Sequence, residues 1–246
     1  MKQNKPIADF FSALAFLTTI PVKQRTEWED RGKLAFFPLV GLLIGVLLVI
    51  VDALAGIFFS FTARGLIDVL FLIVITGGLH LDGLADSADG LFSHRDKNII
   101  LGIMKDSRIG VFGTVALIMA ISAKWWGISF FIPAERWIAL LFIPVFSRSA
   151  MLIVLVFMPY VRDDGIASAF TSEKGKWKEL YFVLIPLILP FFFSWRRAFV
   201  FIIVTCLTML IWSMICHRKI GGVTGDTVGA LEEIVAAALF LTGCAI

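Results

Sequence analysis

Apolar residues in this chain form long runs that short polar segments separate. The runs recur at intervals of roughly 25 to 40 residues, and each is close to the ~20 residues that cross a bilayer as a helix. We therefore expect an all-α, polytopic membrane bundle with about seven transmembrane helices. The expected spans are 36–60, 65–92, 108–132, 136–159, 179–195, 197–216 and 227–246.

The N-terminal run "IADFFSALAFLTTIPV" (7–22) is apolar but short, and Pro21 ends it. Phe10, Leu14 and Leu17 form an apolar stripe at helical spacing. A short helix of this kind is typical of a segment that lies in the membrane interface or re-enters the membrane. We expect one such helix before the spans.

The composition agrees with a membrane protein. The chain is 59% hydrophobic and 17% charged, with a mean hydropathy of +0.92. Its longest polar segments, 21–33, 93–108 and 161–178, are too short to bury a core of their own. We expect a single membrane-embedded domain over residues 1–246. The three cysteines have no metal-type spacing and are expected to pack as small apolar residues.

Charge distribution predicts the orientation of the chain. Alternate loops, starting with the N-terminal segment, hold most of the 22 Lys and Arg residues, so the N-terminus should be cytoplasmic. The net charge of +3 is small and spread over several loops, so we expect no nucleic-acid partner. The cations assigned to the opposite, non-cytoplasmic side are Arg64, Lys124, Arg136, Arg196 and Arg197.

Three aspartates stand where lipid would be expected, in "LHLDGLADSADGLF" (79–92). Asp82, Asp86 and Asp89 are spaced i, i+4, i+7, which places them on one helix face. An ionised acid inside a span costs roughly 2.5 kcal/mol or more. Mg²⁺ would compensate, since it prefers carboxylate oxygens, water and substrate phosphates. The stripe predicts a Mg²⁺-diphosphate site, and the alternative is a solvated helix end with ordinary surface charges.

Two further motifs flank this stripe in sequence. "IMKDSRIGVFG" (103–113) carries Lys105, Asp106 and Arg108, which could neutralise a diphosphate or anchor the next span at the cytoplasmic face. "GGVTGDTVGALEE" (221–233) carries Thr224 and Asp226. From that stretch alone a helix cap at Asp226 is favoured over a metal oxygen.

Three other features leave alternatives open. Arg148 lies inside the fourth span and needs an anionic partner from either the protein or a ligand. His80 falls on a different helix face from Asp82, where a packed or hydrogen-bonded histidine is a more common role than a ligand. "RDDGIASAF" (162–170) is either a lid or a connector.

The motifs together resemble one family. "FFPLVGLLIG" (36–45), the aspartate segment (77–90), "IMKDSRIGVFG" and "GGVTGDTVGA" (221–230) occur in the order of the cobalamin synthases, the adenosylcobinamide-GDP ribazoletransferases. The resemblance covers nearly the whole chain. Ser87, in place of a threonine, and "LFSHRD" (91–96), in place of a more glycine-rich loop, depart from the pattern.

The resemblance implies a Mg²⁺-dependent transfer at phosphorus. A hydroxyl oxygen of α-ribazole, or of its 5′-phosphate, attacks the cobinamide-bearing phosphorus of adenosylcobinamide-GDP. GMP leaves, and adenosylcobalamin or its 5′-phosphate forms. On this basis Asp82, Asp86 and Asp89 are the expected metal ligands, with Asp89 as an alternative general base. The expected catalytic cations are Lys105 and Arg108, and the expected substrate-binding residues are His80, Asp106, Arg148, Thr224 and Asp226.

The implied setting is the cytoplasmic (inner) membrane of a bacterium or archaeon, with the active site facing the cytoplasm. Small-residue faces such as Gly41 to Gly45 would allow a homo-oligomer or close packing within the chain. Rival enzymes are a CDP-alcohol phosphotransferase, whose Ala-Arg pair and second aspartate pair we do not find, and a prenyltransferase, which usually has two aspartate-rich segments. A cation-coupled transporter would place its acids near midplane and show repeats.

Overall fold

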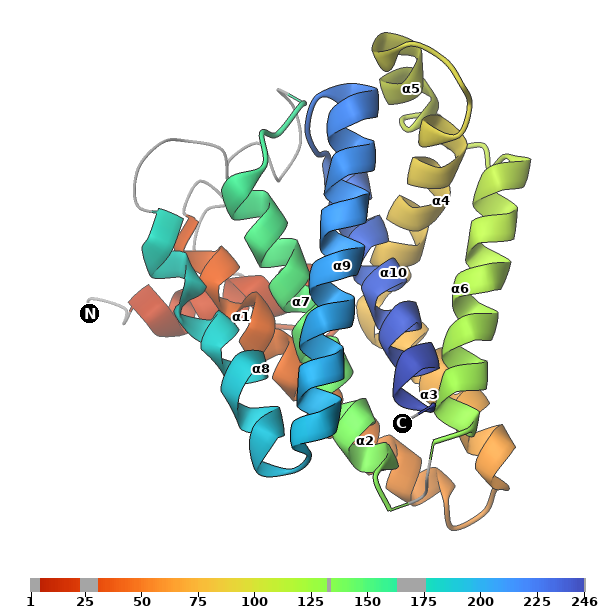
Figure 1. Cartoon of the computed structure of the whole chain (residues 1–246), viewed down its shortest axis with the longest axis vertical. Helices are drawn as coiled ribbons and strands as arrows, with labels where there is room; N and C mark the ends of the chain where they lie inside the picture. Colours follow the sequence, from red (N-terminus) through yellow and green to blue (C-terminus); the bar gives the residue numbers. More distant parts are fainter. Residues whose placement is uncertain (1–4, 23–30, 132–133, 163–175, 246) are drawn as a thin grey trace.

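The computed structural model describes residues 5–22, 31–131, 134–162 and 176–245. These residues are helical apart from turns, connectors and one isolated bridge between Tyr160 and Val223. Most of the helices run along the long axis of the molecule (Figure 1). The expectation of an all-α bundle is confirmed.

Figure 1 labels the α-helices in chain order. In the text, η denotes a short 3₁₀ segment. Their bounds are α1 (Lys5–Leu17), η1 (Arg31–Phe36), α2 (Phe37–Ala55), α3 (Phe61–Thr76), α4 (Leu79–Leu91), α5 (Lys97–Ile103), α6 (Val111–Ser129), α7 (Arg136–Phe157), η3 (Lys176–Val183), α8 (Leu184–Ile188), η4 (Leu189–Phe192), α9 (Trp195–Ile220) and α10 (Gly225–Gly243).

Four helices in the described part of the chain are long and apolar enough to span a membrane: Lys33–Ala55, α6, α7 and α9. The bent pair of α3 and α4 makes five if it counts as one span. Helix α10 has a similar length but carries three acidic side chains, Asp226, Glu232 and Glu233. The chain therefore has the apolar helices of a membrane protein, and the prediction of about seven spans is not confirmed.

The expected span at 65–92 is not one continuous helix. The chain breaks at Gly77 and Gly78, and the two halves, α3 and α4, meet at an angle of 89°. Both glycines have positive φ, 61° and 73°, a conformation that side chains other than glycine rarely adopt. This glycine pair ends α3 and starts α4. Helix α4, which carries the three aspartates, is therefore not collinear with α3.

The expected span at 179–195 is not confirmed. The structure has η3, α8 and η4 there, and the apolar helical stretch Leu180–Phe192 is shorter than a membrane crossing requires. Pro186 and Pro190 lie inside the stretch. Each removes a backbone donor and interferes with the preceding turn, so a continuous helix is disfavoured.

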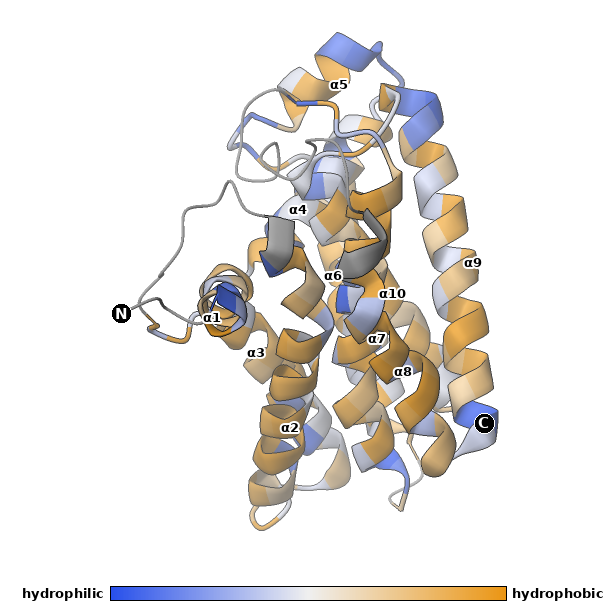
Figure 2. Ribbon diagram, turned by 90° about the vertical axis from the view of Figure 1, so that its left-hand side faces the viewer, coloured by the Kyte–Doolittle hydropathy of each residue, from blue (hydrophilic) through white to orange (hydrophobic). Residues whose placement is uncertain are grey.

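The predicted short N-terminal helix is present as α1. In Figure 2 it is seen nearly end-on, whereas α2 and α9 run lengthwise, so α1 lies across the bundle. Ala13, Leu14 and Leu17 are buried against the other helices. Its position at a membrane interface stays a prediction.

Helices α2 and α7 approach each other closely through Gly41 and Gly45. A Cβ atom on Gly45 would clash with the carbonyl oxygen of Leu141, and one on Gly41 with that of Pro144. The small-residue face is thus used for packing within the chain. It gives no separate indication of a homo-oligomer.

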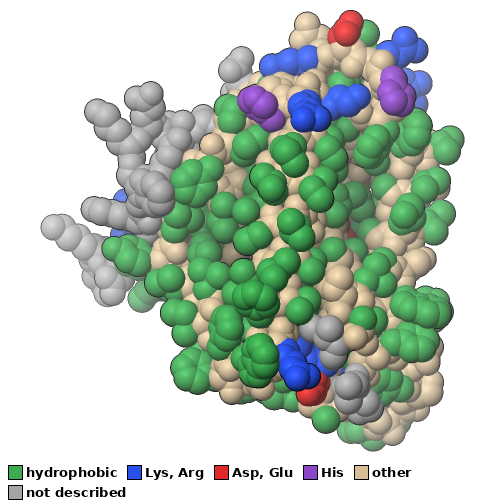
Figure 3. Space-filling view, in the orientation of Figure 1, with side chains coloured by type: hydrophobic (Ala, Val, Ile, Leu, Met, Phe, Trp, Pro, Cys, Tyr) green, Lys and Arg blue, Asp and Glu red, His purple; other side chains and the backbone are tan. Residues whose placement is uncertain are grey.

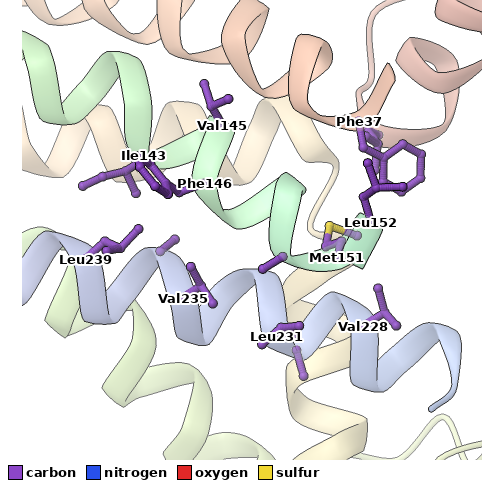
Figure 4. Close-up of a cluster of buried hydrophobic side chains, with 14 of the residues drawn as sticks. Phe37, Ile143, Val145, Phe146, Met151, Leu152, Val228, Leu231, Val235 and Leu239 are labelled. Carbon is purple, nitrogen blue, oxygen red and sulfur yellow. The ribbon is translucent and has the colours of Figure 1, made fainter. Parts of the chain in front are cut away.

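Helix α10 runs through the centre of the bundle and packs against α4, α6, α7 and α9. In Figure 4, Leu231, Val235 and Leu239 of α10 face the side chains of α7, which include Phe146 and Met151. The outer surface carries a broad hydrophobic region, and Lys, Arg and His side chains gather at the end where α5 lies (Figure 3). Hydrophilic residues concentrate at the same end in Figure 2.

Replacing Gly45 with alanine should destabilise the protein, because the added methyl group would force α2 and α7 apart. Overpacking of this kind costs about 1–3 kcal/mol. We expect the midpoint of thermal unfolding in detergent to fall by several degrees. The control is Gly102→Ala, whose Cβ would meet nothing within 4 Å. Equal midpoints for Gly45→Ala and the wild type would contradict the close packing.

Candidate active site

The aspartate stripe lies on α4, as its spacing predicts. Asp82 is exposed, and Asp86 and Asp89 are half-buried. Gly83 faces the neighbouring helix α10, where a Cβ atom would lie 2.7 Å from the carbonyl oxygen of Asp226. Glycine at this position lets the first turn of α10 come close to the stripe.

Asp86 is surrounded by charge. Its electrostatic neighbours are the carboxylates of Asp82, Asp89 and Asp226 and one cation, Arg162. Arg162 forms an ion pair with Asp226, at 2.7 Å between Nη1 and Oδ2. The structure therefore brings Asp226 to the stripe from a distant part of the sequence. The rest of the predicted lid or connector, residues 163–170, lies outside the described residues.

The cap of α10 is Thr224, so the cap interpretation of Asp226 is wrong. The Thr224 hydroxyl accepts a hydrogen bond from the backbone N–H of Thr227 at 3.2 Å. The backbone N–H of Thr224 donates to the Thr227 hydroxyl at 2.8 Å, which completes a capping box. Thr224 is fully buried. Its predicted substrate contact is untested, and its observed role is to start α10.

Asp89 caps another helix. Its Oδ2 accepts a hydrogen bond from the backbone N–H of Gly110 at 2.6 Å, and its Oδ1 accepts one from Gly113 at 2.9 Å. These donors belong to the N-terminal end of α6, where a negative charge is favoured. Asp89 therefore joins α4 to α6, a role that sequence reasoning missed. Its metal and general-base roles stay predictions.

The loop before α6 holds a rigid cation. Arg108 Nε donates to Asp106 Oδ1 at 3.0 Å, and Arg108 Nη2 donates to Asp106 Oδ2 at 2.5 Å. These hydrogen bonds lower the pKa of Asp106 to about 2, so Asp106 is ionised at neutral pH. Lys105 and Arg108 are exposed. The predicted substrate residue Asp106 thus orients the predicted catalytic residue Arg108.

Two cavities lie on either side of the first turn of α4. The larger, of about 510 Å³, is lined by the Gly77–Gly78 bend, Asp82, Asp86 and the loop residues Ser107 and Ile109, among others. The smaller, of about 140 Å³, lies between α4, α7, α10 and the apolar N-terminal elements. Leu79 and Asp82 line both cavities. Asp82 therefore stands where the two spaces meet.

Arg148 and His80 belong to a buried charge network. Arg148 forms an ion pair with Glu232 of α10, and Glu232 also accepts a hydrogen bond from the Ser147 hydroxyl at 2.9 Å. His80 Nδ1 lies 3.3 Å from Glu232 Oε2. All three charged or polar side chains are nearly inaccessible to solvent. The sequence left open whether the anionic partner of Arg148 comes from the protein or from a ligand. The structure shows a partner from the protein, Glu232.

Lys124, which lies within the expected span 108–132 and was counted on the non-cytoplasmic side, is buried. It lies inside α6, is 2% exposed, and donates a hydrogen bond to Glu233 Oε2 at 2.6 Å. Sequence reasoning gave no role to the glutamates of α10, although two adjacent acids in an apolar segment were a signal that cations would be needed. Arg136 and Arg197, two other cations assigned to that side, are buried as well, in ion pairs with Asp68 and Glu135.

The oxygen donors of the stripe suit a divalent cation that shares its ligands with a substrate. Within the described residues, the one group of three whose ligand atoms all lie within 4.8 Å is His80, Glu232 and Glu233. That group already has Arg148 and Lys124 as counter-charges. The stripe carboxylates do not converge so tightly. Mg²⁺ usually keeps water and phosphate oxygens beside one or two carboxylates, so the stripe as a Mg²⁺ site stays a prediction.

The fold and the site define a helical membrane protein with an acidic site, and a cationic loop beside it, at one end of the bundle. The model of the family "Cobalamin-5-phosphate synthase" matches residues 9–245. The chain therefore belongs to the cobalamin-5-phosphate synthase family, and the resemblance found in its motifs is confirmed.

The names of similar proteins agree with this assignment. A protein of Clostridium kluyveri is 37% identical over 237 residues, which covers 92% of both chains. One of Clostridium tetani is 35% identical with 94% of both chains covered, and one of Chlorobaculum tepidum is 35% identical over 96% of this chain and 94% of its own. Each is named adenosylcobinamide-GDP ribazoletransferase. The prediction of a transferase is confirmed, and no solved structure matches the chain.

Replacing Lys124 alone with methionine should destabilise the bundle strongly, because Glu233 would be left buried without its cation. Breaking a buried ion pair on one side costs about 3–5 kcal/mol. The double variant Lys124→Met/Glu233→Leu should recover most of that loss. Denaturant unfolding in detergent would measure both effects. If the double variant were as unstable as the sum of the two single variants, the pair would not be coupled as the structure shows.

Proposed function

We propose that this protein joins the two halves of a corrinoid late in cobalamin biosynthesis. It would transfer the phospho-adenosylcobinamide part of adenosylcobinamide-GDP to α-ribazole or α-ribazole 5′-phosphate. The products are adenosylcobalamin, or its 5′-phosphate, and GMP. The observation that carries this proposal is the acidic stripe beside a cationic loop and a large cavity, in a chain whose relatives are named for this reaction.

The stripe would hold Mg²⁺ on the diphosphate. Asp82 and Asp86 line the large cavity, and Asp89 follows them on the same helix face. Around Asp86 the carboxylates outnumber the cations, so the site favours an added positive charge. When bound, Mg²⁺ would neutralise charge on the diphosphate oxygens, which is a main contribution to phosphoryl transfer.

Lys105 and Arg108 would stabilise the leaving GMP. Arg108 follows Ser107 and Lys105 lies two residues before it, and Ser107 lines the large cavity. Asp106 fixes the Arg108 guanidinium through two of its N–H groups, which reduces the freedom that the side chain loses on binding a phosphate. Asp226 lies near the stripe and forms an ion pair with Arg162. This pair would contribute one negative and one positive charge to the surroundings of Asp86.

The reaction forms one bond and breaks one bond at phosphorus. A free ribose hydroxyl of the acceptor, not the 5′ oxygen that carries the phosphate in α-ribazole 5′-phosphate, bonds to the cobinamide-bearing phosphorus. The bond from that phosphorus to the oxygen of GMP breaks, and the hydroxyl proton passes to a base. The attacking and leaving oxygens must lie roughly in line. Asp89 stays a candidate for receiving the proton or for completing the metal site, in addition to capping α6.

We place the protein in the cytoplasmic membrane of a bacterium or archaeon, with the active site on the cytoplasmic side. The support is the distribution of charge: Lys and Arg side chains gather at the end of the bundle where α5 lies (Figure 3). Such loops face the cytoplasm by the positive-inside rule. A nucleotide substrate would reach the site from the same side.

Replacing Asp82 with asparagine should abolish turnover and leave the fold intact, because Asp82 is exposed and lies where the two cavities meet. The measurement is Mg²⁺-dependent GMP release by purified protein given adenosylcobinamide-GDP and α-ribazole. The matched control is Asp96→Asn, since Asp96 is exposed and its side chain forms no capping hydrogen bond. Full activity of Asp82→Asn would remove Asp82 from the metal site. No GMP release by folded wild-type protein would overturn the proposed function.

Replacing Arg108 with glutamine should lower kcat by roughly 10²–10³-fold, the usual effect of removing one group that stabilises transition-state charge. Asp106→Asn should cost less, because it loosens the guanidinium and leaves its charge in place. Steady-state kinetics at several pH values would test both. Since the pKa of Asp106 is about 2, its ionisation should contribute nothing to the pH profile between about 5 and 8. An Arg108→Gln variant with unchanged kcat would show that the loop is only a membrane anchor.

A further inference from the structure

The smaller cavity has walls of two kinds. Phe16, Phe37, Met151 and Leu155 form an apolar wall, and the rings of Phe16 and Phe37 are stacked with centroids 6.1 Å apart. The opposite wall carries His80, Asp82 and Asp226. Figure 4 shows Phe37 and Met151 at the same end of α7. Such a division suits a molecule with a flat apolar part and a part rich in hydroxyl groups.

His80 indicates a ligand in this cavity independently of its shape. The side chain is 1% exposed. Nδ1 is paired with Glu232 Oε2 at 3.3 Å, whereas Nε2 has no hydrogen-bond partner among the described residues. A buried polar atom without a partner is destabilising, so each one needs an explanation. A hydroxyl group of a bound molecule would provide the partner for Nε2.

The size of the cavity selects between the two substrates. At about 140 Å³ it is smaller than the ~300–1,000 Å³ of pockets that hold drug-sized ligands. A corrinoid ring, which is larger than most drugs, does not fit there. The whole nucleoside acceptor is also larger than the cavity, but its base is a flat aromatic ring system that matches a space of this size. The ribose would extend from the base toward Asp82, at the border with the large cavity.

The position of the cavity completes the argument. The large cavity holds the aspartate stripe and adjoins the cationic loop, where the diphosphate and the leaving GMP are proposed to bind. The small cavity meets it at Leu79 and Asp82, on the other side of the first turn of α4. A hydroxyl held in the small cavity would approach the phosphorus from the side away from the leaving group, as in-line transfer requires.

We infer that the small cavity is the binding site of the nucleoside acceptor. Its aromatic base would lie against Phe16, Phe37 and the α7 side chains, and its ribose hydroxyls would face His80, Asp82 and Asp226. This inference depends on the proposed function. It also predicts that α-ribazole binds to the protein without the corrinoid nucleotide, because the cavity exists before the donor arrives.

The test narrows the cavity at Gly229, which lines it from α10. A Cβ atom there would lie 3.4 Å from His80 Cα and 3.8 Å from His80 Cδ2, at ordinary contact distance, so the fold should tolerate Gly229→Ala. The added methyl group should raise KM for α-ribazole roughly tenfold or more, the effect of one misplaced methyl in a binding pocket. KM for adenosylcobinamide-GDP should change less than twofold. Gly102→Ala, in open space on α5, is the matched control.

Direct binding separates this inference from the proposed function. Calorimetry with α-ribazole alone should show binding to the wild type and to Gly102→Ala, and weaker binding to Gly229→Ala. Leu155→Phe, which narrows the cavity from α7, should act in the same way and serves if Gly229→Ala does not fold. GMP release by the wild type with an unchanged KM for α-ribazole in folded variants would overturn the acceptor site and leave the proposed function standing. A rise in the KM for adenosylcobinamide-GDP alone would also overturn it.

Discussion

The two adjacent glutamates of α10 impose the constraint around which the rest of the bundle is arranged. Glu232 and Glu233 lie inside an apolar interior, where an unpaired charge is very costly. Arg148 of α7 and Lys124 of α6 supply the two positive charges, and His80 of α4 contacts Glu232. Three helices are therefore held to α10 by charge as well as by apolar packing. The aspartate helix is one of them, so the network positions the site without reaching solvent.

The site depends on where α4 begins and which neighbours it meets. Gly77 and Gly78 turn the chain so that α4 departs from the direction of α3. Gly83 admits the first turn of α10, and Asp89 holds the N-terminal end of α6. These contacts bring Asp226 and the cationic loop to the two sides of the stripe. Asp89, a predicted metal ligand or general base, therefore also joins α4 to α6.

A second set of buried ion pairs stabilises the opposite end of the bundle. Arg136 is 2% exposed and contacts Asp52 and Asp68, at 2.8 and 2.6 Å, while its guanidinium lies over the ring of Phe61. These ion pairs join α2, α3 and α7 at the end of the bundle away from the aspartate stripe. A charged residue in an apolar helix can thus have one of two roles here. At one end charges hold helices together, and at the other the carboxylates around Asp86 outnumber the cations.

The sequence by itself determined the class of the protein, the helical character of the chain and the face that the three aspartates share. These follow from local physics: the length of apolar runs, the 3.6-residue period and the chemistry of carboxylates. The order of the motifs also determined the family. Prolines inside an apolar run and a glycine pair inside another were visible, yet whether a helix bends or ends there depends on what packs against it.

Only the tertiary structure decided the partners. Arg148 could have awaited an anionic ligand, and Glu232, 84 residues away in the sequence, is its partner instead. Lys124 had no visible partner in the sequence because Glu233, its counter-charge, is 109 residues distant. Asp226 reached the stripe, and the small cavity formed, because α4 and α10 pack closely at Gly83 and Gly229. Such pairings depend on distances through space, and spacing along the chain carries no information about them.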